Sequence, residues 1–182
     1  IGLFILKSGF GIIKDSLSII IGKKLDEDIA NKIKVDILSI PGITGVYDLI
    51  LNNYGTNKYI GSVHIGVPDT MAASDIMKIE EQIAFMMYCK HNIIMTTGIY
   101  AQNTQGGISQ EIQNELEHLA GDNPNVIQTH GFYFEEDTKF VHFDLVISFD
   151  DPTPKETLDT IQNALKEKYP EYTFYGSIDR EF

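Results

Sequence analysis

The chain has 182 residues, of which 43% are hydrophobic and 22% charged, and its formal net charge is −12. This composition is typical of a folded protein, and the negative charge disfavours nucleic-acid binding, which normally requires a basic surface. Cys89 is the only cysteine, which excludes an intrachain disulfide. The chain starts at Ile1 rather than Met, so we expect it to be a piece of a longer protein.

Residues 1–21 are mostly apolar, but Lys7, Lys14 and Asp15 interrupt them. A membrane-spanning helix needs about 20 predominantly apolar residues, and a signal peptide needs a basic start and a cleavage site of small residues, so the segment fits neither. Two interpretations remain. The segment is either the cytoplasmic end of a membrane helix or an amphipathic helix that packs on a partner. Residues 22–24 follow as a polar linker, which also suits the cytoplasmic side of a membrane.

The rest of the chain repeats one pattern, in which helix, strand, tight turn, strand, helix and strand follow one another over 26–101 and again over 108–179. In the first copy, Pro41-Gly42 ends the first helix. His64 alternates with the apolar residues of its strand and should point away from the apolar face. The elements predicted for this copy are a helix at 26–38, strands at 46–52 and 59–67, a helix at 72–89 and a strand at 92–99.

Residues 103–107 form the predicted linker, after which the second copy begins. Its predicted elements are a helix at 108–119, strands at 126–134 and 139–149, a helix at 155–168 and a strand at 172–179. The strand 139–149 alternates, with Val141, Phe143, Leu145 and Ile147 on one face and His142, Asp144 and Ser148 on the other.

Strand parity also places Asp179 on a face that Asp144 can share. His130, on the first strand of the copy, joins them if the strand register is right, and sequence alone does not fix that register. The corresponding residues of the first copy are Tyr47, His64 and Thr97.

Each copy predicts a small α+β unit. The hairpin gives two antiparallel strands, and the strand–helix–strand crossover makes the third strand parallel to the second with a right-handed connection. Both helices then cover one sheet face, as in a ferredoxin-like fold that lacks one strand. The predicted organisation is therefore a helix and linker at 1–22, a first unit at 23–103 and a second unit at 104–182.

Three stretches resemble the cytoplasmic C-terminal region of cation diffusion facilitator transporters. Residues 3–22 (LFILKSGFGIIKDSLSIIIG) are similar to the end of the last membrane helix of that family and the linker after it. Residues 39–55 (SIPGITGVYDLILNNYG) and 58–71 (KYIGSVHIGVPDTM) resemble the first hairpin. Residues 130–150 (HGFYFEEDTKFVHFDLVISFD) with 169–179 (YPEYTFYGSID) resemble a second C-terminal unit found in some members.

The resemblance implies two tandem metallochaperone-like units, a homodimer, and a regulatory role in the efflux of divalent metal cations. It also implies that the full-length protein lies in the cell membrane with this region facing the cytoplasm. The family's transport site lies in its membrane helices, so this region by itself is not expected to move ions.

Compared with the family pattern, the first unit keeps few metal ligands. The usual His of the first strand is Tyr47, the usual helix His aligns with Met77, and the last strand has Thr97 near its usual His-x-Asp. Only His64 is retained, and a lone imidazole binds metal weakly because zinc sites need three or four protein ligands. We therefore expect the first unit not to bind metal.

In the second unit the aligned positions hold His130, Asp144 and Asp179. One imidazole and two carboxylates could form a three-ligand site completed by water, and such nitrogen and oxygen ligands suit Zn²⁺, Mn²⁺ or Fe²⁺. The alternative is that these three residues are ordinary polar side chains on a solvated sheet face. His142 could serve as another ligand, although a salt bridge to Asp144 is the simpler expectation.

The sequence contains no nucleophile motif, phosphate-binding loop or dinucleotide fingerprint, so we do not expect an enzyme. The main hypothesis is a dimeric regulatory region in which metal binding alters subunit packing. Two alternatives stay open: a dimerisation scaffold that binds no metal, and a soluble small-molecule sensor.

Overall fold

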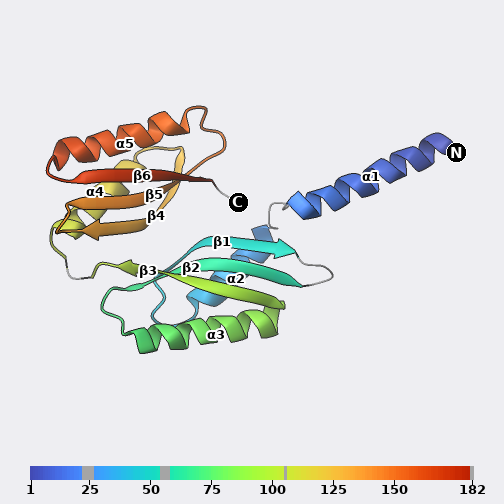
Figure 1. Ribbon diagram of the computed structural model, residues 1–182, viewed down its shortest axis with the longest axis horizontal. Coiled ribbons are helices and arrows are strands. Elements are labelled where there is room, and N and C mark those ends of the chain that lie inside the picture. Colours follow the sequence, from blue (N-terminus) through green and yellow to red (C-terminus); the bar gives the residue numbers. More distant parts are fainter. Residues whose placement is uncertain (22–26, 54–57, 105, 181–182) are drawn as a thin grey trace. The chain divides into compact units, whose positions relative to one another are not determined.

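The computed structural model describes residues 1–21, 27–53, 58–104 and 106–180. The predicted linker at 22–24, most of the first hairpin turn and residue 105 lie outside this range. The described elements follow the predicted order in both copies (Figure 1). They are α1 (Gly2–Ile21), α2 (Glu27–Leu38), β1 (Gly45–Asn53), β2 (Tyr59–Pro68), α3 (Ala73–His91), β3 (Ile93–Gln102), α4 (Ile108–Gly121), β4 (Val126–Glu135), β5 (Phe140–Ile147), α5 (Pro154–Lys168) and β6 (Thr173–Arg180).

The strands form two three-stranded sheets, with the orders β1-β2-β3 and β4-β5-β6. In the second sheet β4 and β5 are antiparallel, and β5 and β6 are parallel, as the crossover rule predicts. The α+β, ferredoxin-like fold class is thereby confirmed. The chain divides into two compact units. Residues 66–71, which include the end of β2, and residues 100–102 at the end of β3 are grouped with the second unit. The boundary at 103/104 stays a prediction.

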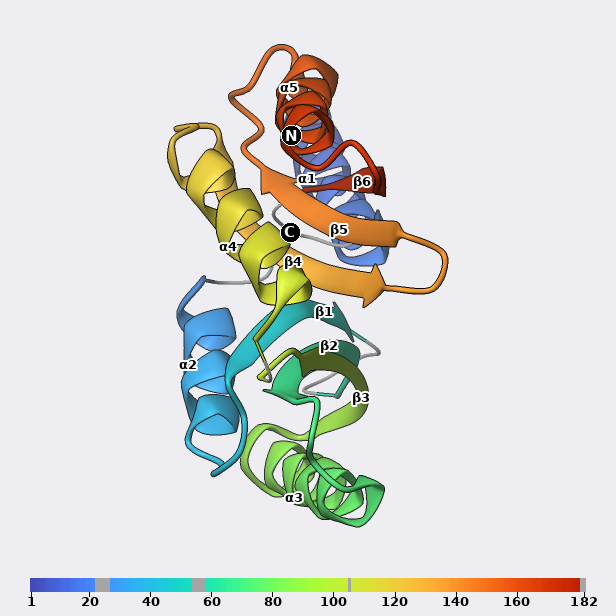
Figure 2. The same ribbon diagram turned by 90° about the vertical axis from the view of Figure 1, so that its left-hand side faces the viewer.

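The second unit buries one face of its sheet beneath α4 and α5 (Figure 2). Its core comprises residues from both helices and from β5 and β6, among them Ile112, Leu116, Phe143, Leu145, Leu158, Leu165 and Phe174. The residues of β5 alternate between buried and half-buried along the strand, which confirms the predicted apolar face. Burying each such side chain contributes about 1.5–3 kcal/mol. The opposite face of the sheet therefore holds His142 and Asp144.

The first unit buries Ile33 and Ile37 of α2 together with Ile83 and Met87 of α3. Val35, which is apolar and lies in the same helix, is 66% exposed. The reason is helical geometry, because residues four apart share a face, whereas a residue midway between them points to the other side.

Helix α1 exposes most of its large apolar side chains, including Leu3, Phe4, Leu6 and Phe10. Among the described helices, none combines the length and the hydropathy that a membrane span requires. Both interpretations of this segment therefore stay predictions.

Candidate metal centre

The three residues predicted as ligands lie on three adjacent strands of the second unit. His130 of β4 pairs directly with Asp144 of β5, and Asp144 lies beside Ser177 of β6. Asp179 pairs with Val146, two residues further along the strands and therefore on the same sheet face. The strand register that the sequence could not determine thus brings the three side chains together on the face opposite the helices.

The two carboxylates face different edges of the same imidazole ring. Oδ2 of Asp144 is 3.7 Å from Nδ1 of His130, and Oδ2 of Asp179 is 3.4 Å from Nε2. The side chain of His130 is 1% exposed, that of Asp144 is 16% exposed and that of Asp179 is 46% exposed. His130 therefore lies between the two acids, and the three residues do not surround one common point.

A β-bulge next to His130 makes room for the Asp144 carboxylate. The pairing of β4 with β5 shifts between His130 and Tyr133, and Gly131 within this bulge has φ +62°. A Cβ atom at Gly131 would collide with Oδ2 of Asp144. Glycine is thus required here twice, for a left-handed backbone and for the space that the carboxylate occupies.

His142 also belongs to this cluster. Its Nε2 is 3.6 Å from Oδ1 of Asp144, and its Nδ1 lies 3.4 Å from the carbonyl oxygen of Gly131. Its ring stacks on Tyr175, with centroids 5.7 Å apart. The sequence signal for this residue was its position two before Asp144, because residues i and i+2 of a strand share a face.

The donors of this cluster are imidazole nitrogens and carboxylate oxygens, and Asp144 also accepts a hydrogen bond from the Ser177 hydroxyl. Nitrogen and oxygen donors suit borderline divalent cations such as Zn²⁺, Mn²⁺ and Fe²⁺. Both carboxylates flank His130, and a bound dication would reduce the repulsion between them. The residues present are therefore chemically suited to hold a divalent ion.

The first unit uses His64 differently. Nδ1 of His64 is 2.9 Å from Oδ2 of Asp48, and Asp48 has φ +50°. Sequence reasoning missed Asp48 because strict strand alternation places it on the face opposite Tyr47, whereas the left-handed backbone at this residue departs from that alternation.

The last strand of the first unit also aligns differently from the prediction. A Cβ atom at Gly98 would collide with the His64 ring, so Gly98 is the neighbour of His64 on β3. In the second unit, the β6 residue next to Asp144 is Ser177, and Asp179 lies two residues beyond it. Its first-unit counterpart is therefore Tyr100 rather than Thr97.

A separate ion-pair cluster joins α2 to the end of α3. Asp36 accepts hydrogen bonds from Lys90 at 2.6 Å and from His91 at 2.7 Å. These bonds, that from Lys90 first, hold the pKa of Asp36 below its usual value. His91 thus has a structural partner that explains its position. Cys89, two residues before it, is exposed.

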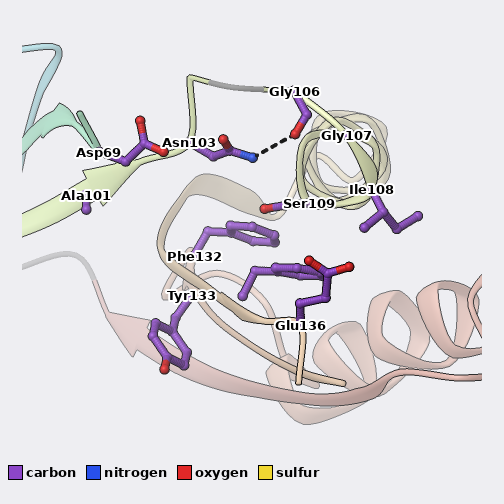
Figure 3. Close-up of a pocket in the computed structure, with 11 residues that line it drawn as sticks. Asp69, Ala101, Asn103, Gly106, Gly107, Ile108, Ser109, Phe132, Tyr133 and Glu136 are labelled. Atoms are coloured by element: carbon purple, nitrogen blue, oxygen red, sulfur yellow. Dashed lines mark hydrogen bonds between the residues drawn. The ribbon is translucent and has the colours of Figure 1, made fainter. Parts of the chain in front are cut away.

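The second unit also contains an open cavity of about 550 Å³ (Figure 3). Phe132 and Glu136 line it, and Asn103 donates a hydrogen bond of 3.2 Å to the Gly106 carbonyl at its edge. Asp69, the other carboxylate that lines the cavity, accepts hydrogen bonds from the amide and hydroxyl of Thr104. The lining residues include neither a histidine nor a cysteine, so this cavity is separate from the histidine cluster in its chemistry.

Comparison with known proteins finds a similarity in the first unit. Residues 25–97 match the family model described as the cytoplasmic domain of cation efflux proteins. None of the curated proteins compared with the chain matches it.

Solved structures similar to the chain include C-terminal domains of two named proteins. A nickel form of a MamM C-terminal-domain variant is 22% identical, with a TM-score of 0.39, and the match covers 42% of this chain and 99% of that one. A manganese form of another MamM variant is 22% identical, with a TM-score of 0.38, and covers 42% and 98%. The metal-bound C-terminal domain of the CzcD transporter from Thermotoga maritima is 18% identical, with a TM-score of 0.39, and covers 48% and 99%.

The sequence resemblance to cation diffusion facilitators is thereby confirmed over the residues that the family model matches. These residues include α2, both strands of the first hairpin and α3. Over residues 25–97 the chain is therefore similar to the cytoplasmic domain of cation efflux proteins.

Proposed function

We propose that this chain is the cytoplasmic regulatory and dimerisation region of a membrane transporter that exports divalent metal cations. The match of residues 25–97 to the cytoplasmic domain of cation efflux proteins is the observation on which the proposal rests. The exposed apolar side chains of α1 support its assignment as the end of the last membrane helix. The full-length protein would then lie in the cell membrane with both units facing the cytoplasm.

The second unit is the proposed metal-binding unit, through the cluster that contains His130, Asp144 and Asp179. Its support is the set of nitrogen and oxygen donors on one sheet face and the closeness of both carboxylates to one buried imidazole. Zn²⁺, Mn²⁺ and Fe²⁺ all suit such donors. In the first unit, His64 is engaged with Asp48, so that unit is assigned to dimerisation rather than to metal binding.

Metal binding would act on the packing of the two subunits. The chain has a net charge of −12, so two copies repel each other, and bound dications reduce that repulsion. A ligand that binds one packing better than the other shifts the equilibrium between them. The metal-bound dimer is therefore expected to be more compact, and this change would pass to the membrane part.

Native mass spectrometry with Zn²⁺ or Mn²⁺, combined with small-angle X-ray scattering, tests the proposal. We expect a dimer that holds about one divalent ion per chain and has a smaller radius of gyration with metal. A dimer that retains no ion at micromolar metal would instead support a metal-independent scaffold. A metal-insensitive chain whose melting temperature rises with a small organic ligand would support the sensor alternative.

A further inference from the structure

We infer that two copies of this chain pair through the outer edge of β3, strand against strand, around a twofold axis at Thr96. The inference rests on the proposed dimerisation role of the first unit and specifies the surface that carries it. It concerns residues 93–99, which are the part of β3 that belongs to the first compact unit.

β3 is an edge strand, because its sheet has the order β1-β2-β3 and β2 is its only strand neighbour among the described residues (Figure 1). On the β2 side, the amide of Tyr59 donates to the Asn92 carbonyl just before β3. At the other end, the amide of Asp69 donates to the Gln102 carbonyl. Both acceptors are even-numbered, so the even-numbered residues of β3 direct their backbone groups to β2. The odd-numbered residues between them therefore direct an N–H and a C=O to the outer edge.

Exposed edge strands invite pairing with another chain, and proteins usually block them with charges, prolines or bulges. Three of the four edge strands that the structure describes contain such a feature. β1 contains Asp48 with φ +50°, β4 has the bulge at Gly131, and β6 carries Asp179. β3 (IIMTTGIYAQ) contains no charged residue and no proline, and none of its residues has a positive φ. Its edge is therefore open to another strand.

Charge identifies that strand as one from a second copy of the chain. Each chain has a net charge of −12, and like charges directly opposite each other destabilise a strand pair. Two β3 strands meet without such a repulsion, because neither carries a charge. A different partner would not require a neutral edge, since its own charges could complement those of this chain. The absence of charge on β3 thus favours self-pairing.

The packing of β3 holds this edge in an extended conformation before any partner binds. The side chains of Ile93 and Met95 point into the core of the first unit and are 1% and 8% exposed. Ile94, between them, is 46% exposed on the opposite face. Pairing therefore requires little additional ordering of the backbone, and a pre-organised surface binds at a lower entropic cost.

A twofold axis makes the contact self-complementary and determines which residues meet. With the axis at Thr96 and antiparallel strands, Met95 exchanges backbone hydrogen bonds with Thr97 of the other copy. The exposed Thr96 side chain lies opposite its own counterpart, and such threonine pairs stabilise sheets. Ile94 lies opposite Gly98, where the absence of a side chain on the neighbouring strand leaves room beside it.

Disulfide cross-linking of the full 182-residue chain tests this register. Cys89 is first replaced by serine, and Thr96→Cys is then oxidised mildly. We expect a covalent dimer, because the Cα atoms of the two cysteines would lie about 4.5 Å apart, within the disulfide range of about 4.4–6.8 Å. Ile94→Cys is the matched control on the same strand and face. Its two copies would be four residues apart, roughly 14 Å, and should not cross-link. Cross-linking at 94 but not at 96 would overturn the register.

Analytical ultracentrifugation of charge variants gives an independent readout. Thr96→Lys and Thr96→Glu each place like charges opposite each other and should raise the dimer Kd by about tenfold or more. An equal mixture of the two variants should form a dimer again, because opposite charges then meet. Met77→Lys, at a 62% exposed position of α3, is the control and should leave the Kd unchanged. A mixture that stays as weak as either variant alone would contradict the pairing of Thr96 with itself.

A backbone variant tests the edge without adding charge. The N–H of Thr97 points to the outer edge, so Thr97→Pro removes a donor for the second copy and leaves the hydrogen bonds to β2 intact. We expect this variant to remain folded by circular dichroism and to dissociate into monomers. Thr97→Ala keeps the N–H and should remain a dimer.

The outcomes separate this inference from the proposed function. A wild-type chain that stays monomeric at every concentration refutes the dimerisation role, and with it the inference. A dimer that neither Thr96→Lys nor Thr97→Pro weakens keeps the dimerisation role and refutes only the β3 interface. Open-ended oligomers that Thr96→Lys abolishes would overturn the twofold pairing, because a closed twofold contact stops at two copies.

Discussion

Replacing Gly131 by alanine tests whether the bulge of β4 is what makes room for Asp144. The left-handed backbone at Gly131, with φ +62°, costs a non-glycine residue about 1–2 kcal/mol. The new Cβ also collides with the Asp144 carboxylate, and moving that carboxylate breaks its hydrogen bond to Ser177, which costs about 1–2 kcal/mol more. We therefore expect the second unit to lose about 2–4 kcal/mol.

Thermal unfolding followed by circular dichroism measures this loss. In a unit of this size, each kcal/mol lowers the melting temperature by about 4–8 °C, so the transition of the second unit should fall by roughly 10 °C or more. Gly106→Ala is the matched control, because Gly106 has φ +76° but nothing within 4 Å of its Cβ position. It should show only the backbone cost. Equal losses in the two variants would mean that Asp144 does not need the space at Gly131, and the reasoning would be refuted.

Three further changes test other parts of the structure. The hydrogen bond from Lys90, followed by that from His91, holds the pKa of Asp36 below its usual value. This carboxylate therefore stabilises the fold above its unfolded pKa, and the contribution disappears as pH falls through the folded pKa. Asp36→Asn should remove that part of the acid sensitivity and cost about 1 kcal/mol of unfolding free energy at pH 7. If the unfolding free energies of wild type and variant fall in parallel as the pH is lowered, the role of this ion pair is contradicted. Phe143→Ala should destabilise the second unit by about 3–5 kcal/mol, because Phe143 is fully buried; urea unfolding checks this, and a loss below 1 kcal/mol would argue against its place in the core. Asp151→Ala should cost about 1–3 kcal/mol, because this carboxylate is 5% exposed and accepts two hydrogen bonds from the start of α5, and hydrogen exchange in the first turn of α5 should rise accordingly.

The fold was predictable because local patterns determine it. The alternation of Val141, Phe143, Leu145 and Ile147 identified the buried face of β5, and the structure leaves all four fully buried. The crossover rule then fixed the direction of the last strand. The predicted repeat is confirmed for the same reason, since each copy contains its own helix and strand signals.

The details of the site were less predictable because they depend on backbone irregularities. Sequence parity could place Asp144 and His142 on one face, but only the register shows that His130 pairs with Asp144. Likewise, alternation gives no hint that Asp48 adopts a left-handed backbone and turns its carboxylate to His64. Irregular φ values at polar residues leave almost no signal in a single sequence.

Comparison of the two units shows how their histidine clusters differ. At the position of the Gly131 bulge the first unit has Asp48, whose own carboxylate pairs with His64. In the second unit that position is glycine, and the space is filled by a carboxylate from the neighbouring strand that also faces His142. The first-unit counterpart of His142 is Ser62. At this position one unit therefore pairs a single imidazole with a single acid, whereas in the other unit one acid faces two imidazoles.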